Sequence, residues 1–572
     1  MYLISTMKNY KIDQMINDLK KIISETNIIT KPNEVINYSK GIRVGGGKAY
    51  AVLLPDDLLQ FWKSLKILVK YEKIIIIQAA NTGLTGGSTP HGDLYDRDVV
   101  IINTLKINKI ILINEGKQII SLAGATLYEL EDELNKISRS PHSVIGSSCI
   151  GASIVGGICN NSGGNLLNRG PAYTELSLYA ELDEKRNLNL VNNLGIDLGI
   201  KPEEILERLM NSDFNKSNIS NHNKIASDNE YQQRIRDTNA STPARFNSDE
   251  RRLFEASGCA GKIAVFAVRV DTFPKAQNEQ VFYIGTNDPN KLTKIRSTML
   301  SKFKTLPEMG EYFHRSFFDA SDYYCKDNFL AIKYMGASFL PKLFKAKCNL
   351  DNFFAKTPIL MENISDKLLQ CLSTILPDHL PKSLRKYRNK YEHHLIILAS
   401  NECIDDTRHL LEITKISSDD FNYFECNKKE SDSAMLLRYV AGAAPARAKI
   451  IEGEDVGEIL PFDVALPRNT KNWSDVIDKD IESYMSKSFK MGHFFCMVFH
   501  WDFIVKPNLD ANKVKEIILE KFDNINAKYP AEHNVGHLYK ADENLSAHYK
   551  RLDPTNTFNS GIGRMSKFKN YN

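Results

Sequence analysis

Histidine and glutamate gather at two places in the last 80 residues of the chain. Glu532, His533 and His537 lie within six consecutive positions, and His493 and His500 lie seven apart upstream, although the chain holds only 13 histidines. An imidazole can take up a proton near neutral pH, and imidazoles together with a carboxylate suit a divalent metal. The cluster predicts a catalytic base, a metal site or a polar substrate pocket. It leaves open a metal-dependent hydrolase built on His533 and His537.

Two segments rich in glycine and other small residues indicate a bound cofactor. The first, AANTGLTGGS (79–88), follows the apolar run IIIIQ (74–78), and the second is GSSCIGASIVGGICNNSGG (146–164). Small residues let the backbone approach a ligand closely, and successive N–H groups in such loops form concave sites for a pyrophosphate. GxGxxG after the first strand, GxxxxGK[ST], GxSxG and HExxH are all missing, which excludes the common Rossmann, P-loop, α/β-hydrolase and zincin sites.

The elements that must position these residues follow a mixed pattern. Strands are predicted at 49–55, 74–78, 99–104 and 109–115, and helices at 8–25, 56–73 and 125–137. A polar stretch from 202 to 250 predicts a long excursion over the surface, and KIAVFAVRVDTF (262–273) predicts a return strand. This alternation of strands and helices predicts an α+β fold.

Composition is that of a globular protein in a reducing compartment. The 572 residues are 42% hydrophobic and 25% charged, with a net charge of +4, a balance too mild to indicate nucleic-acid binding. Nine cysteines without a CxxC pair argue against a disulfide framework, a zinc ribbon and a cysteine-ligated iron–sulfur cluster. The N-terminus lacks a signal-peptide pattern, and no stretch of 18 apolar residues occurs. We expect a cytoplasmic protein, soluble or peripherally attached to a membrane.

The stretch from 341 to 390 is strongly basic. It holds ten lysines and arginines against four acidic residues, so its net charge is +6 and the rest of the chain sums to about −2. Leucines and phenylalanines interleave with the charges, which suits helices lying on an anionic surface, where each cation is worth about 1 kcal/mol. A solvated basic face is the alternative. The cations are Lys342, Lys345, Lys347, Lys356, Lys367, Lys382, Arg385, Lys386, Arg388 and Lys390.

Several long motifs resemble one family. AANTGLTGGSTP, PHSVIGSSCIGASIVGGICNNSGG and GCAGKIAVFAVRVDTF are similar to the PCMH-type FAD-binding domain of the vanillyl-alcohol-oxidase-type flavoproteins. The match is closer to the members that oxidise D-lactate and pass the electrons to quinone. It continues through RGPAYTE (169–175), TPARFN (242–247), KYEHHL (390–395), AEHNVGHLYKA (531–541) and DPTNTFNSGIG (553–563).

The resemblance implies a domain organisation. Residues 1–275 would form the FAD-binding domain, with its PCMH-type core at about 45–216 and the surface excursion at 202–250. Residues 276–515 would form an α+β cap that carries the substrate site and a basic helical membrane-contact insert at about 313–390. Residues 516–572 would return to the FAD domain.

The resemblance also implies the cofactor contacts. FAD would bind without a covalent bond, because the first loop contains no histidine, the residue through which some relatives attach it. The implied contacts are Ala79, Ala80, Asn81, Thr82, Gly83, Gly87, Ser88, Gly146, Ser153, Gly163 and Ala264.

In related 2-hydroxyacid dehydrogenases the Glu-His pair faces the flavin, which implies His533 as the base and adds Glu532, His493 and His500 to the site. Some relatives bind a divalent metal through the two upstream histidines and the glutamate. The segment GHFFCMVFH (492–500) departs from their loop, so we expect a polar substrate pocket without a metal. A 2-hydroxy acid needs a cation for its carboxylate, and Arg447 takes this position in the family pattern, with His394 and Arg468 as weaker candidates.

The implied activity is FAD-dependent oxidation of D-lactate to pyruvate, with the electrons passed to membrane quinone. His533 would take the hydroxyl proton while the C2 hydrogen leaves as hydride to flavin N5. The enzyme would sit on the cytoplasmic face of the inner membrane, held on an anionic surface by residues 341–390, and would bind no nucleic acid. Another D-2-hydroxy acid, such as 2-hydroxyglutarate, is the alternative substrate.

Overall fold

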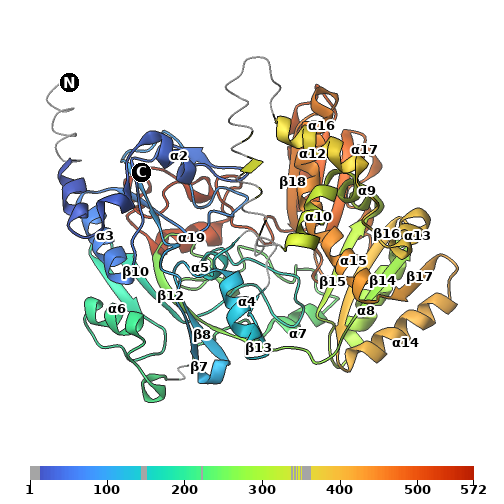
Figure 1. Cartoon of the computed structure of the whole chain (residues 1–572), viewed down its shortest axis with the longest axis horizontal. Helices are drawn as coiled ribbons and strands as arrows, with labels where there is room; N and C mark the ends of the chain where they lie inside the picture. The colour runs from blue at the N-terminus through green and yellow to red at the C-terminus, as the bar shows by residue number, and fades with distance from the viewer. Residues whose placement is uncertain are drawn as a thin grey trace.

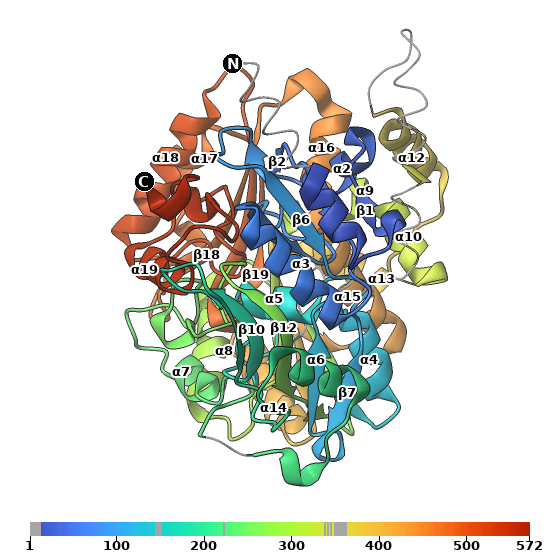
Figure 2. The ribbon, with the colours of Figure 1, turned by 90° about the vertical axis from the view of Figure 1, so that its left-hand side faces the viewer.

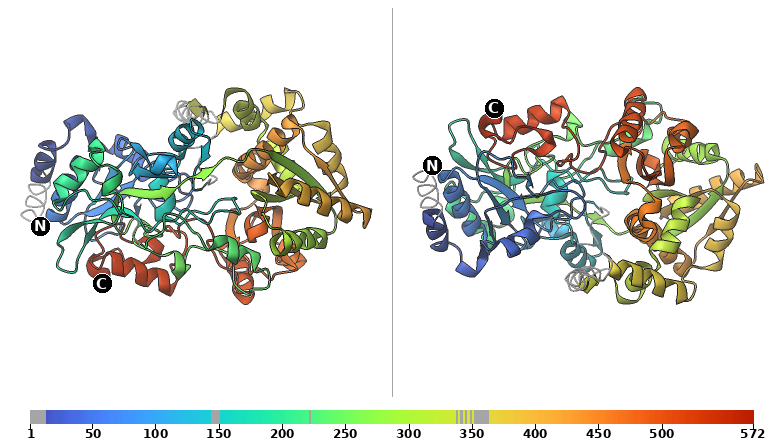
Figure 3. Two further views of the ribbon diagram at one scale, coloured as in Figure 1. Left: turned by 90° about the horizontal axis from the view of Figure 1, so that it is seen from below. Right: turned by 90° about the horizontal axis from the view of Figure 1, so that it is seen from above.

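The computed structural model describes residues 13–143, 151–220, 223–336 and 363–572, together with 339, 343, 346–347 and 350. Two lobes lie side by side (Figure 1). The first lobe contains a four-stranded and a five-stranded sheet, and the second is built on one seven-stranded sheet. Figure 3 shows the end of the chain, in the darkest red, packed against the first lobe.

The four-stranded sheet has the order β1-β3-β6-β4, from Ile28–Ile29, Ala51–Leu53, Val99–Asn103 and Ile74–Gln78. Strands β3, β6 and β4 are parallel because helix α3 (Leu58–Lys70) crosses over between β3 and β4. Asp57 begins this helix by accepting a hydrogen bond from the backbone N–H of Gln60 at 2.7 Å. The predicted strands and helix in this region are confirmed: β4 has the predicted bounds, and β3, β6 and α3 are shorter than predicted.

The five-stranded sheet is antiparallel, with the order β11-β10-β12-β8-β7. Its strands are Leu188–Asn192, Ser177–Leu182, Ala264–Asp271, Gln118–Leu122 and Ile110–Ile113. Helix α4 (Leu127–Asn135) follows β8 and begins at a capping box of Thr126 and Glu129. The predicted strand at 262–273 and helix at 125–137 are confirmed.

The seven-stranded sheet of the second lobe is antiparallel, with the order β17-β14-β16-β15-β19-β20-β18. Its strands are Phe421–Glu425, Glu279–Thr286, His393–Ser400, Met309–His314, Met485–His493, Val498–Val505 and Ile459–Ala465. Alternate residues of β14 enter two hydrophobic clusters. Phe282 and Ile284 pack with helix α8 (Pro289–Lys302), and Val281 and Tyr283 pack with helix α9 (Arg315–Tyr324). The sheet is therefore covered on both faces.

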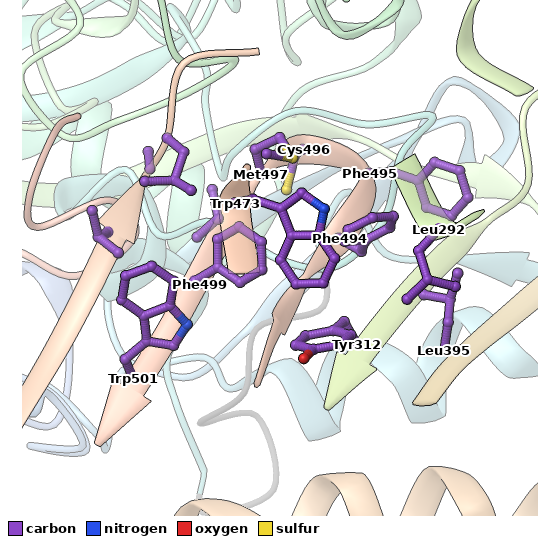
Figure 4. Packing of buried hydrophobic residues seen from close by; sticks show 14 of the residues in the cluster. Leu292, Tyr312, Leu395, Trp473, Phe494, Phe495, Cys496, Met497, Phe499 and Trp501 are labelled. Atoms are coloured by element: carbon purple, nitrogen blue, oxygen red, sulfur yellow. The ribbon is translucent and has the colours of Figure 1, made fainter. Parts of the chain in front are cut away.

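The hairpin between β19 and β20 is anchored in this core. Phe494, Phe495, Met497 and Phe499 are fully buried, and Trp473 stacks on Phe499 with 5.6 Å between ring centroids (Figure 4). Met497 has φ +59°, which closes the tight turn of the hairpin. The apolar segment FFCMVF thereby fixes the positions of His493 and His500 at its two ends.

The polar stretch 202–250 does more than cross the surface. It contains helices α6 (Pro202–Asn211) and α7 (Tyr231–Arg236), and Tyr231, Ile235 and Ala244 are buried in the core of the second lobe. The prediction of a surface excursion is thus wrong for residues 231–245. Apolar side chains spaced among polar neighbours here join the two lobes.

The C-terminal segment completes the first lobe. The backbone N–H of Ile75 in β4 donates to Thr557 O, and the N–H of Asn559 donates to Ile75 O, both at 2.9 Å. Asn559 also donates from Nδ2 to Gly87 O at 2.8 Å and to Ala260 O at 2.7 Å. Helix α19 (Glu543–Leu552) belongs to this segment, whereas helix α18 (Ala511–Asn524) packs through Val514, Ile518 and Phe522 in the core of the second lobe, so the return to the first lobe begins after α18 rather than at 516.

Candidate active site

Four polar side chains form a row across neighbouring strands of the seven-stranded sheet. Glu311 on β15 lies opposite His493 on β19, and His500 on β20 lies opposite Asp463 on β18. His500 also pairs with Met491 on β19, which lies two residues from His493. Paired residues, and residues two apart on one strand, project from the same face of a sheet, so all four side chains lie on one face. Strand order and register therefore bring together residues up to 190 positions apart in the chain.

The two histidines of this row turn the same nitrogen toward Glu532. His493 Nε2 lies 3.3 Å and His500 Nε2 lies 3.5 Å from Glu532 Oε2, and the two Nε2 atoms are 3.4 Å apart. The other ring nitrogens face carboxylates, since His493 Nδ1 is 2.7 Å from Glu311 and His500 Nδ1 is 3.5 Å from Asp463. A carboxylate behind each ring is the usual second layer of a metal site.

The spacing of these three atoms fits a divalent metal. Bonds of about 2.0–2.2 Å at tetrahedral angles separate neighbouring ligand atoms by about 3.3–3.6 Å. No ion is needed to hold Glu532, which is buried and ion-paired with buried Arg245. Burial disfavours a charged ring at His493, but Glu311 and Glu532 raise its pKa to about 10. The site is thus a cluster of closely paired charges whose nitrogen and oxygen atoms are spaced like the ligands of a metal ion.

His533 lies beside the cluster and forms a pair with Asp463. Its Nδ1 donates to Asp463 Oδ2 at 2.8 Å, and the same oxygen accepts the backbone N–H groups of Glu532 (2.8 Å) and His533 (3.0 Å). Although burial opposes it, the Asp463 charge raises the pKa of His533. A third of the His533 side chain remains exposed. This geometry fixes the tautomer that leaves Nε2 free to accept a proton.

His533 and His537 do not share a site. The His537 ring lies 2.9 Å from Thr89 O through Nε2 and stacks on His91 with 4.9 Å between centroids. Burial lowers its pKa to about 4. The two histidines bind different partners, so the structure gives no support to a hydrolase built on them.

Arg447 is charge-paired in the second lobe. It lies on helix α16 (Ala444–Glu452), 3.0 Å from Asp327 on helix α10 (Lys326–Met335) and 2.6 Å from Asp366 on helix α12 (Ile364–Ile375). The guanidinium is buried and joins three helices, and within the described residues its ion pairs are with Asp327 and Asp366 rather than with the histidine cluster. The expectation that it offers a free charge to substrate is therefore corrected.

The two weaker candidates also have structural partners. His394 is fully buried on β16, where the Tyr283 hydroxyl lies 3.2 Å from its Nδ1, and burial lowers its pKa to about 3. Arg468 donates to backbone and side-chain oxygens of Thr242 at 2.9 and 2.8 Å. Both residues hold the fold together.

A different arginine, absent from the sequence expectations, lies near the base. Arg43 donates to Gly442 O at 3.2 Å, and its Nη1 is 3.9 Å from Asp502 on β20. A third of its side chain is exposed, and its charge acts on the pKa of His533. Glu311, Asp463 and Arg245 were missed as well. Only Arg245 lay in a motif, TPARFN, that the resemblance had already marked.

The first glycine-rich loop follows β4 and is held from behind. Gln78 donates to Ser88 O and Tyr38 O, each at 2.8 Å, and Asn103 donates to Ala79 O at 2.9 Å. Asn81 has φ +53°, and its side chain accepts a hydrogen bond from Ser88 Oγ at 2.9 Å. The predicted contacts Ala79, Ala80, Asn81, Thr82, Gly83, Gly87 and Ser88 all belong to this loop.

The second loop reaches the same place from the other side of the lobe. Ser153 begins helix α5 (Ile154–Cys159) by accepting the Gly156 N–H at 3.0 Å. Ala264 is buried in β12, and Gly146 lies outside the described residues. A Cβ added at Gly163 would come within 2.6 Å of Glu532 Oε1, so this loop touches the histidine cluster.

Asn534 joins the two loops directly after the base. Its side chain donates to Asn160 Oδ1, its carbonyl oxygen accepts Thr85 Oγ1–H at 2.8 Å, and a Cβ on Gly87 would lie 3.1 Å from its Nδ2. Segments 79–88, 151–164 and 532–537 therefore converge.

The loops fit a dinucleotide. A Cβ added at Gly83 or Gly151 would meet nothing within 4 Å, so both positions face open space. The buried oxygens Asn161 Oδ1 and Asn559 Oδ1 lack hydrogen-bond partners among the described residues. Glycines that face open space and buried polar side chains without partners suit a pyrophosphate and a polar ring edge.

The described part of the basic stretch exposes apolar residues as well as charge. Helix α12 exposes Leu368, Leu372 and Ile375 (49, 58 and 81%), and helix α13 (Lys382–Lys390) exposes Lys382, Lys386 and Lys390 along one side. We call these six side chains the insert surface. Lys342, Lys345 and Lys356 lie outside the described residues.

Not all of the positive charge is free. Lys347 pairs with Asp366 at 2.6 Å, Arg385 with Asp378 at 2.6 Å, and Arg388 with Asp319. A count of charges along the chain thus overstates what this region offers to an anionic surface. In the part of the chain that the structure describes, no helix has the length and apolarity needed to cross a bilayer.

Similar proteins match nearly the whole chain. A family described as "D-lactate dehydrogenase, membrane binding" matches residues 281–571, and an FAD binding domain matches residues 49–173. A quinone-dependent D-lactate dehydrogenase of Haemophilus influenzae is 49% identical over 98% of this chain and 99% of its own. Proteins with the same description from Escherichia coli and Corynebacterium glutamicum are 45% and 39% identical, each over at least 98% of both chains.

Solved structures are similar in fold at low identity. A p-cresol methylhydroxylase with bound substrate has a TM-score of 0.59 at 12% identity, with 97% of each chain covered. A 4-ethylphenol oxidase from Gulosibacter chungangensis has a TM-score of 0.57 at 10% identity, also with 97% of each chain covered. The predicted α+β class and PCMH-type fold are confirmed.

Proposed function

The chain belongs to the quinone-dependent D-lactate dehydrogenases, and from this premise we propose how its residues carry out the reaction. The protein is an FAD-dependent oxidoreductase that converts D-lactate to pyruvate and passes the electrons to quinone. The observation that carries the site assignment is the convergence of both glycine-rich loops on the segment Glu532–Asn534.

Bound FAD supplies the acceptor for the hydrogen that leaves C2 of lactate with its electron pair. The loops 79–88 and 151–164 hold it without a covalent bond, and their placement beside His533 would set the substrate between cofactor and base. Buried walls around this point exclude water, because Glu532, Asp463 and Arg245 are each at most 6% exposed.

His533 is proposed as the general base. Its Nε2 accepts the hydroxyl proton of lactate as the C2–H bond breaks, and Asp463 stabilises the imidazolium that results. The support is geometric, since the 2.8 Å bond to Asp463 holds the ring from Nδ1 and a third of the side chain remains accessible.

His493, His500 and Glu532 are proposed to hold a divalent ion. This departs from the expectation of a metal-free pocket, and the reason is their mutual spacing of 3.3–3.5 Å, with Glu311 and Asp463 behind the rings. Such an ion would act as a Lewis acid toward the substrate oxygens. Without it, the same groups would form a polar wall of the substrate pocket.

Arg43 is proposed to bind the substrate carboxylate in place of Arg447. It is a partly exposed cation close enough to influence His533, and its 3.9 Å contact with Asp502 leaves donors available. A guanidinium presents paired N–H donors that match a carboxylate.

Attachment to the membrane is peripheral. We propose that the insert surface makes this contact, with Lys382, Lys386 and Lys390 near anionic headgroups and Leu368, Leu372 and Ile375 entering the interface. The cytoplasmic face of the inner membrane is the proposed location.

The test is an anaerobic absorption spectrum of the purified protein. D-lactate should bleach the flavin band, and L-lactate and D-2-hydroxyglutarate should do so much more slowly. His533→Gln should keep the flavin and lose the bleaching. Equal bleaching in the variant would remove His533 from the base role, and faster bleaching by D-2-hydroxyglutarate would change the substrate.

A further inference from the structure

A hollow of about 470 Å³ lies beside the first glycine-rich loop, separate from the histidine cluster. Its walls come from four separate stretches of the chain, and none of the lining residues is acidic. They are Val44, His91, His537, Leu538, Gly561, Arg564, Met565 and Lys567.

The inner wall of this hollow is shared with the cofactor loop. The backbone N–H of His537 donates to Thr85 O at 2.9 Å, and the His537 ring contacts Thr89 O at the same distance. Gly86 packs so closely on Gly45, next to Val44, that an added Cβ would lie 2.8 Å from the Gly45 Cα. A ligand in the hollow would thus be separated from the loop that holds FAD by little more than one layer of backbone.

The lining combines an apolar surface with cations. Val44, Leu538 and Met565 supply the apolar part. Arg564 is exposed, and Lys567 Nζ lies 2.5 Å from His91 O; burial, followed by the charges of Lys567 and Arg564, lowers the pKa of His91. A planar apolar ring with carbonyl acceptors at its edge fits this combination, and the nearby positive charge favours the electron-rich reduced form of such a ring.

Exposed apolar side chains stand close in sequence to the lining residues. Ile42 (55%), Leu94 (81%) and Phe568 (49%) each lie within three positions of a lining residue. In Figure 2, helix α2 (Pro32–Ser39), strand β2 (Gly46–Gly47) and helix α12 all lie in the upper half of the molecule, with α12 at its right-hand edge. Exposed apolar side chains next to the lining suit a lipid-soluble ligand.

We propose that this hollow binds the headgroup of the membrane quinone. The proposal rests on the quinone-dependent activity stated above. Oxidation of D-lactate to pyruvate releases two electrons and two protons, and the quinone in the hollow takes up two electrons and two protons to become the hydroquinone. Lactate and quinone thus use different openings, one at His533 and one at Met565.

Two variants test the site. Met565→Trp fills the hollow, and Arg564→Glu reverses the charge of an exposed side chain that makes no hydrogen bond or ion pair within the described residues. Ile200→Trp is the control, because it adds the same ring at a residue that is 92% exposed beside α6, on the opposite, lower side in Figure 1.

Three rates are measured by anaerobic stopped flow. They are the reduction of the flavin by D-lactate, the reoxidation of the reduced flavin by a short-chain ubiquinone analogue, and its reoxidation by ferricyanide. Met565→Trp and Arg564→Glu should slow reoxidation by the quinone about tenfold or more. Reduction by D-lactate and reoxidation by ferricyanide should stay within about twofold of the wild type. The control should behave like the wild type in all three.

Unchanged quinone rates in both variants would overturn the proposal, and so would an equal slowing by Ile200→Trp. Binding of inorganic phosphate in the hollow that does not compete with the quinone would also overturn it and assign an anion site. Failure of D-lactate to reduce the wild-type flavin would instead refute the proposed function, because that half-reaction needs no quinone.

Discussion

Replacing Asp463 by asparagine removes the charge that orients His533 and keeps the shape of the side chain. In the wild type, Oδ2 accepts the His533 Nδ1–H at 2.8 Å and two backbone N–H groups. An amide oxygen can replace only part of this, and an amide NH₂ turned toward Nδ1 would favour the tautomer that blocks Nε2. A hydrogen bond to a charged group contributes about 1.5–3 kcal/mol. We therefore expect flavin reduction to slow about 10- to 150-fold.

The assay is anaerobic stopped-flow reduction by D-lactate and by C2-deuterated D-lactate. Asp463→Asn should retain its flavin and show an isotope effect at least as large as that of the wild type, since hydride transfer limits the rate. Asp271→Asn is a matched control. Asp271 lies on β12, and its carboxylate accepts hydrogen bonds from Gln118 at 2.8 Å and from Ser227 at 2.5 Å. A loss below about threefold, or an equal loss in the control, would refute the orienting role of Asp463.

Four further outcomes are expected. Arg43→Ala should lower kcat/KM for D-lactate about 10- to 150-fold with partial recovery in Arg43→Lys, whereas Arg447→Met should lower the melting temperature with KM unchanged. Elemental analysis should find one divalent metal per chain, and His500→Ala should lose it with flavin retained. The double variant Leu372→Glu, Ile375→Glu should bind anionic vesicles more weakly than the wild type, even at low salt. The control variant Ile413→Glu, Ile416→Glu changes two exposed residues of helix α14 (Cys403–Ile416) and should bind like the wild type. Burial lowers the pKa of Lys262 from 10.5 to about 8, so the folded chain gives up this proton first as pH rises. Wild-type stability relative to Lys262→Met should therefore increase by about 3 kcal/mol from pH 8 to 10.5, as followed by unfolding curves.

The first lobe could be predicted well from the sequence because its elements carry local signals. Short β-branched runs such as IIIIQ (74–78) stand between polar turns, and Asp57 and Thr126 begin helices at the expected places. The stretch 231–245 could not be predicted. Its buried residues, Tyr231, Ile235 and Ala244, are scattered among polar neighbours and gain their burial only from the other lobe.

The histidines and the glycine-rich loops could be found by type and spacing, but their partners could not. Glu311 and Asp463 reach the site through strand order and register in a seven-stranded sheet, and no local pattern records that order. Arg447 was chosen from its place in a motif, and two carboxylates on other helices decide its actual contacts. Arg43 stands in an exposed segment with no pattern of its own.

The pairing of Ile75 with the segment 557–559 sets an order of assembly. Asn559 bonds Gly87 from 472 positions away, and Thr557 and Asn559 bond the edge of β4, so the first cofactor loop gains its last supports only when residues near 559 have been synthesised. Contacts so distant in sequence form late, because a long loop must close first. During synthesis the nascent first lobe would present an open strand edge to other chains. FAD capture would thus mark the end of translation rather than the completion of the first lobe's own sequence.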